Sequence, residues 1–377
     1  MLAVIYLDNN ATTRIAPAVK AAMLPYLDDE FGNPSSQSAI GARAKEALLR
    51  SRLAISDFVK ASPTEIVFTS GATESNHAAI LGAIEHFSGK RNRIVTTAVE
   101  HPATLRLLQS RKEVEVVLLS VDRQGRLDPA QIDAAITTNT ALVSVMWANN
   151  ETGVVFPVEE IARIAKQRGA LFHTDAVQAI GRLPLNFRDS SIDLLSFSGH
   201  KLHAPKGIGG LLVKKGLMLP PFIIGSQERG RRGGTENVMG IAALGEAIAL
   251  PSENGEIETL RNLLEELVLS GLSDCTVNGT ASPRIGNTSS ITFSGIDGEE
   301  LLMAIEKEGI IASQSAACQS GGRKPSHVLI AMGLQEGEAK ATLRFSLSRY
   351  NRREEVEEAA RIIVSAARRA RARNPFA

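Results

Sequence analysis

A lysine at the end of a predicted strand has the clearest capacity for chemistry in this 377-residue chain. Lys201 follows the apolar run 192–196 and Ser198-Gly-His, and precedes a Gly/Pro turn and a second apolar run at 210–213. Loops at the carboxyl ends of strands in open α/β sheets bind ligands, and a lysine there can form an imine with a carbonyl cofactor such as pyridoxal phosphate. On this stretch alone, Lys201 and Lys206 are interpreted equally well as surface charges beside a tight turn.

A turn of small residues connects the predicted strand 65–69 to the predicted helix 75–86. The unpaired N–H groups and the dipole at the start of such a helix suit an anion. Its glycine spacing matches neither a Walker A motif nor a dinucleotide-binding fingerprint. A plain N-capped helix, with Ser70 or Thr73 as the cap, is the commoner interpretation of this turn in isolation.

Two further strand ends carry polar residues. His101 follows the predicted strand 93–97, where an imidazole can stack on a flat ring or move protons. Asn149 and Asn150 follow the predicted strand 141–147, and their amides can donate to a phenolic oxygen or a carboxylate. The simpler interpretations are a hydrogen-bonded histidine and an ordinary Asn/Gly turn.

A carboxylate follows the next predicted strand, 170–173. Asp175 lies there with Gln178 just beyond it. A fixed carboxylate keeps a pyridine nitrogen protonated, whereas the alternative is an aspartate that caps the next helix. The order along the chain favours the first interpretation, because a turn, a histidine, an asparagine, an aspartate and a lysine at successive strand ends would surround one phosphorylated aromatic ring.

The elements that would position these residues alternate between strand and helix. Further strands are predicted at 114–119 and a helix at 157–168, and this alternation implies a largely parallel sheet with helices on both faces. Turn residues at 251–255 mark a boundary. After it we expect a helix at 258–269, a strand at 287–294, a helix at 299–308, a strand at 342–346 and a final helix at 353–371. The predicted units are therefore 15–250, and 1–14 together with 251–377.

Composition limits the classes of function. With 44% hydrophobic residues and a net charge of +1, the chain is typical of a globular protein without a broad nucleic-acid surface. We interpret the basic tail from Arg368 to Arg373 as the solvated end of a helix. Two distant cysteines, Cys275 and Cys318, indicate neither a disulfide framework nor a CxxC metal site, and fit a reducing cytoplasm best. We expect no signal peptide, membrane span or metal site.

Several motifs in register resemble the cysteine desulfurases, and the resemblance runs nearly end to end. These are pyridoxal-phosphate enzymes of the fold-type I, class V aminotransferase group, and the chain is most similar to the long-loop branch that supplies sulfur for iron–sulfur clusters and related products. The motifs are Tyr6-Leu-Asp-Asn-Asn-Ala-Thr-Thr13, Phe31-Gly-Asn-Pro-Ser-Ser36, Thr69-Ser-Gly-Ala-Thr-Glu-Ser-Asn76, Glu100-His101, Asn149-Asn-Glu-Thr-Gly153, Asp175-Ala-Val-Gln178, Ser198-Gly-His-Lys201, Gln227-Glu-Arg-Gly-Arg-Arg-Gly-Gly-Thr-Glu-Asn-Val238 and Ser313-Gln-Ser-Ala-Ala-Cys318.

The resemblance implies an α/β fold with a mostly parallel seven-stranded sheet in a large pyridoxal-phosphate-binding domain and a smaller α+β domain that carries the catalytic cysteine loop. Lys201 would hold the cofactor and move the substrate Cα proton, and Cys318 would accept sulfur. The remaining implied contacts with pyridoxal 5′-phosphate and substrate are Asp175 to the ring nitrogen, His101 stacked on the ring, Asn150 and Gln178 at the ring oxygen, Ala72, Thr73, Ser198 and His200 at the phosphate, Thr235 from the partner subunit of a homodimer, and Arg344 with Asn150 at the substrate carboxylate.

The residues around Cys318 support a reactive thiol independently of the resemblance. Residues 314–322 are small, polar and glycine-rich, as in an exposed loop, whereas most cysteines are buried and inert. The reaction implied is conversion of L-cysteine to L-alanine with a persulfide on Cys318. The family's Gly-Ser-Ala-Cys is here Ser315-Ala-Ala-Cys318, which predicts a stiffer hinge. Cys275 is interpreted as structural.

The final sulfur acceptor stays open among iron–sulfur assembly, tRNA thiolation and DNA phosphorothioation. We expect an acceptor protein, a homodimer and no direct nucleic-acid binding.

The alternative function is a selenocysteine lyase or another class V pyridoxal-phosphate aminotransferase or lyase. A non-catalytic binding scaffold is a third hypothesis, which the intact Lys201 and Asp175 disfavour.

Overall fold

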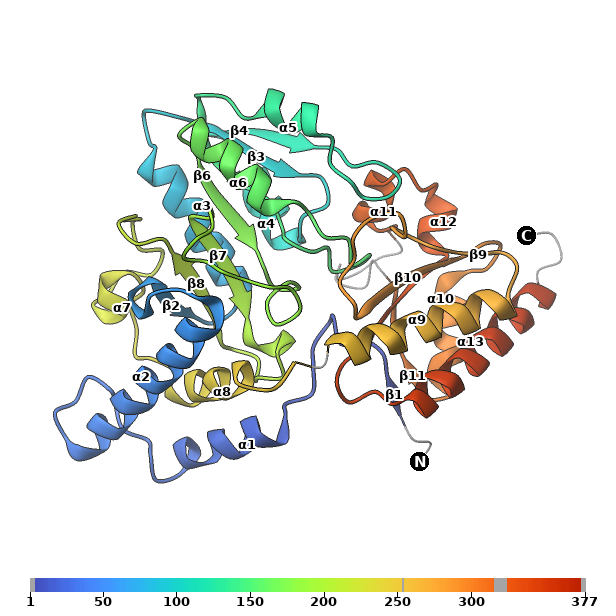
Figure 1. Cartoon of the computed structure of the whole chain (residues 1–377), viewed down its shortest axis with the longest axis horizontal. Helices are drawn as coiled ribbons and strands as arrows, with labels where there is room; N and C mark the ends of the chain where they lie inside the picture. The colour runs from blue at the N-terminus through green and yellow to red at the C-terminus, as the bar shows by residue number, and fades with distance from the viewer. Residues whose placement is uncertain (1–3, 253, 315–323, 374–377) are drawn as a thin grey trace.

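The computed structural model describes residues 4–252, 254–314 and 324–373. Figure 1 shows two layered bodies side by side, the larger built from the blue-to-yellow part of the chain and the smaller from the orange and red part. The dark-blue strand β1 belongs to the smaller body, so both ends of the described chain lie there.

A seven-stranded sheet forms the centre of the larger body. Its strand order is β2-β8-β7-β6-β5-β3-β4, and β8 alone runs antiparallel to its neighbours. The strands are β2 (Ile66–Thr69), β3 (Arg93–Thr97), β4 (Glu115–Leu119), β5 (Thr140–Ser144), β6 (Leu171–Asp175), β7 (Leu194–Ser198) and β8 (Gly209–Val213). This confirms the predicted α/β fold with a mostly parallel seven-stranded sheet.

Helices cover both faces of this sheet. Neighbouring residues of a strand point to opposite faces, and Leu142 belongs to the apolar cluster under α3 and α4 whereas Val143 belongs to the cluster under α2, α6 and α8. The central strands are buried on both faces, and their buried polar residues Ser144, His173 and Ser196 pair with one another. The elements are α1 (Pro17–Met23), η1 (Leu24–Leu27), α2 (Ala39–Val59), η2 (Pro63–Glu65), α3 (Ala72–His86), α4 (Pro102–Ser110), α5 (Pro129–Ala135), α6 (Val158–Gln167), η3 (Gly199–Lys201), α7 (Gln227–Gly230) and α8 (Val238–Ile248).

The smaller body contains an antiparallel four-stranded sheet, β12-β13-β10-β9, and a parallel pair, β1-β11. Cys275 opens β9 and is buried in this body's core. The elements are β1 (Ile5–Tyr6), α9 (Asn254–Gly271), β9 (Cys275–Val277), β10 (Thr288–Phe293), α10 (Gly298–Lys307), β11 (Ile310–Ile311), β12 (Ser313–Gln314), α11 (His327–Ala331), α12 (Glu336–Lys340), β13 (Thr342–Ser346) and α13 (Arg353–Arg373).

The apolar residues of α11 and α12 join the core of the larger body. Val328, Leu329 and Ala339 belong to the same apolar cluster as β5, β6 and β7. The chain after residue 324 therefore returns to the larger body before β13 enters the smaller sheet.

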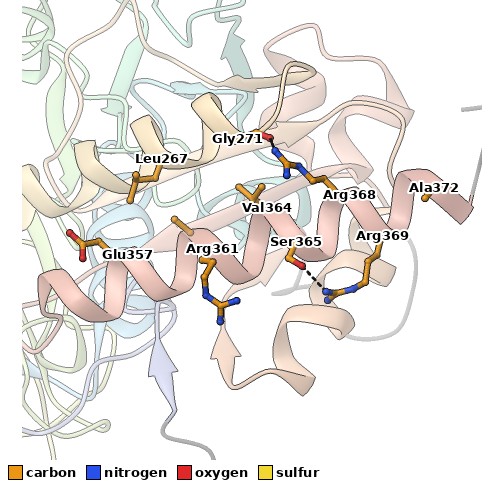
Figure 2. A pocket seen from close by; sticks show the side chains of 10 residues that line it. Leu267, Gly271, Glu357, Arg361, Val364, Ser365, Arg368, Arg369 and Ala372 are labelled. Atoms are coloured by element: carbon orange, nitrogen blue, oxygen red, sulfur yellow. Dashed lines mark hydrogen bonds between the residues drawn. The ribbon is translucent and has the colours of Figure 1, made fainter.

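An open groove lies between α9 and α13, and is called here the α9–α13 groove. Its volume is about 640 Å³, and Figure 2 shows Leu267 and Val364 between the two helices. Arg368 donates to the carbonyl of Gly271 at 2.8 Å across it. Within the described ranges, no helix combines the length and apolar character needed to cross a membrane.

Candidate active site

Lys201 lies in the turn that follows β7, at the carboxyl edge of the large sheet. Its Nζ donates to the carbonyl oxygen of Asn10 and, at 2.7 Å, to that of Ala11. Both acceptors belong to the N-terminal segment that crosses from the smaller body. The lysine is therefore held at the junction of the two bodies, where it also contributes to a hollow of about 120 Å³.

Asp175 is the last residue of β6 and is 6% exposed. Its Oδ2 accepts from Asn76 Nδ2 at 2.7 Å, and its Oδ1 accepts from the backbone N–H of Val177 at 3.0 Å. Residues 176–180 form turns rather than a helix. The interpretation of Asp175 as a helix cap is therefore wrong, and the carboxylate is instead oriented by a side chain of α3.

The turn between β2 and α3 has an open helix N-terminus. α3 begins at Ala72, three residues before the predicted start, and no side chain caps it, so the interpretation with Ser70 or Thr73 as the cap is wrong. The N–H of Ser70 is taken by Glu74 Oε2 at 2.8 Å. Gly71 has φ +152° and ψ 179°, a conformation essentially restricted to glycine. The first-turn N–H groups of Ala72 and Thr73 therefore suit an anion.

Ser198 and His200 lie beside this turn. Ser198 is buried, and its Oγ would be 3.7 Å from a Cβ added at Gly71. His200 Nδ1 lies 3.2 Å from Thr12 Oγ1. Burial, reinforced by the charges of Lys201 and Lys206, lowers the pKa of His200 to about 4. The imidazole is therefore neutral at neutral pH and available as a hydrogen-bonding group.

His101 is the N-cap residue of α4. Its Nδ1 accepts from the backbone N–H of Ala103 at 3.2 Å, which places the proton of the neutral ring on Nε2. Burial lowers the pKa of His101, opposed by the charge of Asp175 and reinforced by that of Lys201. The charges of Asp175 and Lys201 therefore both act on this imidazole, in opposite directions.

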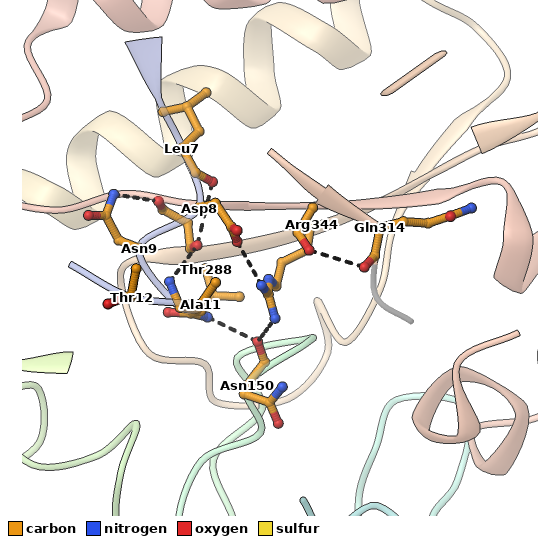
Figure 3. Close-up of polar contacts among 12 residues, drawn as sticks. Leu7, Asp8, Asn9, Ala11, Thr12, Asn150, Thr288, Gln314 and Arg344 are labelled. Atoms are coloured by element: carbon orange, nitrogen blue, oxygen red, sulfur yellow. Dashed lines mark hydrogen bonds and ion pairs between the residues drawn. The ribbon is translucent and has the colours of Figure 1, made fainter. Parts of the chain in front are cut away.

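Arg344 connects β13 to the larger body, as Figure 3 shows. The side chain is 2% exposed; one terminal nitrogen pairs with Asp8 Oδ1 at 2.7 Å and the other donates to the Asn150 carbonyl at 3.1 Å. Within the described part of the chain, its buried Nε has no hydrogen-bond partner. A buried N–H donor of this kind, next to an ion pair, is available to donate a hydrogen bond to a substrate carboxylate.

Asn150 and Gln178, the two residues predicted to bind a ring oxygen, are both held by contacts within the chain. Asn150 is held by its backbone carbonyl, which accepts from Arg344 and from Asn10 Nδ2 at 3.0 Å. Gln178 is buried, and its Oε1 accepts from Arg182 at 3.0 Å while its Nε2 donates to the carbonyl of Asn10 at 3.4 Å. Asn10 therefore contacts both predicted residues.

The two remaining predicted residues are Thr235 and Cys318. Thr235 is exposed, and lines a hollow of about 210 Å³ together with Thr69 and Ser70. Cys318, the predicted sulfur acceptor, lies outside the described residues.

Sequence reasoning assigned no role to Asp8, Asn10 or Asn76. They orient Arg344, Lys201 and Asp175 respectively. Asn10 and Asn76 are at most 2% exposed, although asparagine is rarely buried. The available signal was a polar run, Asp8-Asn-Asn10, directly after an apolar strand.

The donor set fits pyridoxal 5′-phosphate. The oriented carboxylate of Asp175 suits a protonated ring nitrogen, and the open N-terminus of α3 with Ser198 and His200 suits a phosphate dianion. Gly209 permits the close approach of the phosphate-side turn, because a Cβ there would lie 2.7 Å from the Cα of Gly71. Lys201 lies three positions after the end of β7, the strand between β6 and β8.

Comparisons with known proteins agree with this arrangement. The class V aminotransferase family model matches residues 5–358. A cysteine desulfurase of Trichormus azollae is 47% identical over 100% of this chain and 96% of its own length, and the cysteine desulfurase NifS of Azotobacter vinelandii is 45% identical over 96% and 92%. The solved structure of a NifS-like protein has a TM-score of 0.89 and 34% identity over 96% of this chain and 98% of its own. The structure titled SspA in complex with cysteine has a TM-score of 0.82 and 35% identity over 92% and 99%. The chain therefore belongs to the class V aminotransferase family and, within it, to the cysteine desulfurases.

Proposed function

We propose that the protein converts L-cysteine to L-alanine and retains the sulfur as a persulfide on Cys318. The observation that carries the proposal is the junction of the two bodies, where Lys201, Asp175 and Arg344 are each oriented by a separate hydrogen bond or ion pair. The balanced reaction is cysteine plus the Cys318 thiol giving alanine plus the Cys318 persulfide. The substrate C–S bond breaks, an S–S bond forms, and no external oxidant is needed.

Pyridoxal 5′-phosphate, when bound, supplies an electron sink for negative charge at the substrate Cα. The first-turn amides of α3 would hold its phosphate with Ser198 and His200. Asp175 would hold the proton on the ring nitrogen, and the flat face of His101 would cover the ring. Asn150 and Gln178 would bind the ring oxygen; for Gln178 this requires exchange of its contact with Asn10.

The residues of this chain divide the remaining tasks. Lys201 would attach the cofactor and move the proton at the substrate Cα, which requires release of its Nζ from the carbonyls of Asn10 and Ala11. The buried Nε of Arg344 would receive the substrate carboxylate beside Asp8. The Cys318 thiolate would then attack the substrate sulfur.

The deciding experiment measures alanine formation from cysteine by the wild-type holoenzyme, Cys318→Ala and Lys201→Ala. We expect loss of activity in both variants, with the visible cofactor absorption retained in Cys318→Ala. Equal rates in wild type and Cys318→Ala would reject the desulfurase assignment in favour of another class V activity. Turnover by a colourless Lys201→Ala protein would reject the cofactor assignment.

We also propose a homodimer in which Thr235 reaches the partner's phosphate site. Thr235 is exposed, and large apolar side chains are exposed on the same body, including Phe31 at 74%, Met218 at 83% and Ile224 at 89%. A partner subunit would bury apolar side chains of this kind. Sedimentation of the holoenzyme tests the proposal, and a monomer at micromolar concentration would reject it.

The division of the chain into 15–250, and 1–14 with 251–377, remains our proposal for the domains. The separate apolar clusters support it, although α11 packs with the larger one. We further propose a cytoplasmic location and a protein as the sulfur acceptor. Limited proteolysis tests the domain boundaries, and transfer of radiolabelled sulfur to candidate proteins tests the acceptor.

A further inference from the structure

The chain that follows residue 323 is attached to the larger body by a buried hydrogen bond. Ser326 is the N-cap residue of α11, where its Oγ accepts from the Leu329 N–H at 3.2 Å. The same hydroxyl donates to Glu151 Oε2. Ser326 is 1% exposed and Glu151 5% exposed, so water does not compete for this contact.

A second contact holds the adjacent residue. His327 Nε2 lies 2.9 Å from the carbonyl oxygen of Glu100, and because a carbonyl only accepts, the ring donates. Burial lowers the pKa of His327, so the ring is neutral at neutral pH. Glu100 directly precedes His101, the predicted ring-stacking residue.

The two loops that receive these contacts form one frame. Asn149 Oδ1 accepts from the N–H groups of Glu151 and Thr152 at 2.9 and 3.0 Å, and its Nδ2 donates to the Val99 carbonyl at 3.1 Å. The frame therefore joins the loop that carries Asn150 to the loop that carries His101. Ser326 and His327 are each bonded to one of these loops.

The chain before residue 315 is held at the smaller sheet. Gln314 pairs with Leu343 in β13, next to Arg344, and its Nε2 donates to the Lys340 carbonyl at 2.6 Å. Cys318 is four positions after Gln314 and eight before Ser326. The described chain is therefore held on both sides of Cys318, at Gln314 and at Ser326.

We propose that Glu151 and His327 are positioning residues for sulfur transfer: they attach the chain after Cys318 to the loops that carry Asn150 and His101. This inference rests on the proposed function. Fixing both ends of a short segment raises the effective concentration of its thiol at the substrate sulfur. Loss of one attachment lowers the rate of persulfide formation without changing how the cofactor is bound.

The charge state of Glu151 makes a conservative variant possible. Burial raises the pKa of Glu151 to about 7, opposed by the hydrogen bond from Ser326 and by the charge of Arg344. A glutamine is nearly isosteric with this carboxyl, and its oxygen can still accept from Ser326. Glu151→Gln should therefore retain most of the function that Glu151→Ala loses.

The test is a single-turnover experiment on the reconstituted holoenzyme. We expect Glu151→Ala and Ser326→Ala to slow persulfide formation on Cys318, followed by mass spectrometry, by about tenfold or more. The cofactor's visible absorption and its initial change on cysteine addition should stay as in wild type. Both variants remove the Ser326–Glu151 bond, and Ser326→Ala also removes the cap of α11, so the double variant should be no slower than Ser326→Ala alone. His327→Gln, which can donate to the Glu100 carbonyl, should be faster than His327→Ala.

Glu65 provides a matched control. It is 6% exposed and accepts from the N–H groups of Ser62 and Lys215 at 2.7 and 2.8 Å, at the amino end of β2 and away from the site. Glu65→Gln should leave persulfide formation unchanged. If Glu151→Ala fails to fold, Ser326→Ala and Glu151→Gln decide the question.

Three results would overturn the inference: wild-type persulfide formation in Ser326→Ala, additive losses in the double variant, or a parallel change in cofactor absorption. Failure of the proposed function is distinguishable. In that case, the wild-type holoenzyme itself would form no persulfide on Cys318.

Discussion

The α9–α13 groove and the carboxyl edge of the large sheet differ in how their charged groups are satisfied. The groove is large and open, and its arginines have partners at the surface. Arg361 pairs with Glu358, with side chains 66% and 47% exposed, and Arg369 pairs with Glu308. Arg344 reaches the sheet edge from β13 of the smaller sheet, and its side chain is 2% exposed and pairs with Asp8.

The sheet edge also retains buried polar atoms without partners in the described part of the chain. These are Arg344 Nε, Glu100 Oε2 and Asn76 Oδ1. Folding normally satisfies such atoms, because an unsatisfied buried donor or acceptor costs about 1–3 kcal/mol. Asn76 orients Asp175, and Arg344 is the proposed carboxylate-binding residue. Among the described residues none of these unsatisfied atoms lines the groove, so they favour the sheet edge over the groove as a ligand site.

The largest difference between the two regions should appear when an arginine is removed from each. Arg344→Ala should lower kcat/KM for cysteine by roughly 10- to 100-fold, the equivalent of a charged hydrogen bond of about 1.5–3 kcal/mol. It should also lower the free energy of unfolding by about 3 kcal/mol, because the Asp8 carboxylate, only 15% exposed, is left without its cation. Steady-state kinetics and denaturant titration measure the two effects.

Arg344→Lys separates the effect on stability from the effect on activity. Lysine keeps the charge but lacks the fork that reaches Asp8 and the Asn150 carbonyl together. It should recover more stability than activity. Equal recovery of both would contradict a role in substrate binding.

A smaller effect is expected from the side chain that orients Asp175. Asn76→Ala removes the 2.7 Å hydrogen bond to Asp175 Oδ2 and should slow alanine formation about tenfold, because the carboxylate loses its fixed direction. Asn278→Ala is the matched control, since Asn278 is 4% exposed and donates to Thr292 Oγ1 at 3.0 Å in the smaller body. Unchanged turnover in Asn76→Ala would argue against Asp175 as the ring-nitrogen partner.

Local sequence predicts the residues at strand ends but not what holds them. Asp175 and Lys201 could be placed because parallel strands deliver their carboxyl ends to one edge. The contacts of Lys201 with Asn10 and of Arg344 with Asp8 span 191 and 336 residues. Nothing in the periodicity of either segment encodes such a pairing.

The sequence prediction differs from the structure at the end of one strand and in one helix that was not predicted. The strand predicted at 141–147 ends at Ser144, although Val145 and Trp147 are buried and still donate to the β6 carbonyls of His173 and Asp175. The helix α2 is absent from the sequence prediction, although buried Ala44, Leu48 and Ile55 recur at helical spacing.

The free energy of unfolding should depend on pH through Glu100 at the sheet edge. Burial raises the pKa of Glu100 to about 8, opposed by hydrogen bonds from the Met146 N–H and Thr97 Oγ1. The folded state therefore binds a proton that the unfolded state has released, and the free energy of unfolding should fall as pH rises from about 5 to 8. The slope is up to about 1.4 kcal/mol per pH unit.

Glu100→Gln should flatten this dependence. Both hydrogen bonds are accepted by Oε1, which a glutamine retains. Measured by thermal denaturation, the stability of the Glu100→Gln variant relative to wild type should rise between pH 5 and pH 8. A constant difference across that range would show that Glu100 is ionised in the folded protein.

The smallest effect is expected in the groove. Arg361→Ala should leave the melting temperature and alanine formation within error, because salt and water screen a pair exposed on both sides. The double variant Arg361→Ala/Arg369→Ala should also retain wild-type persulfide formation, since neither arginine contacts a residue placed in the site. Loss of persulfide formation in this double variant would contradict the assignment of the chemistry to the sheet edge, because both side chains are far more exposed than Arg344.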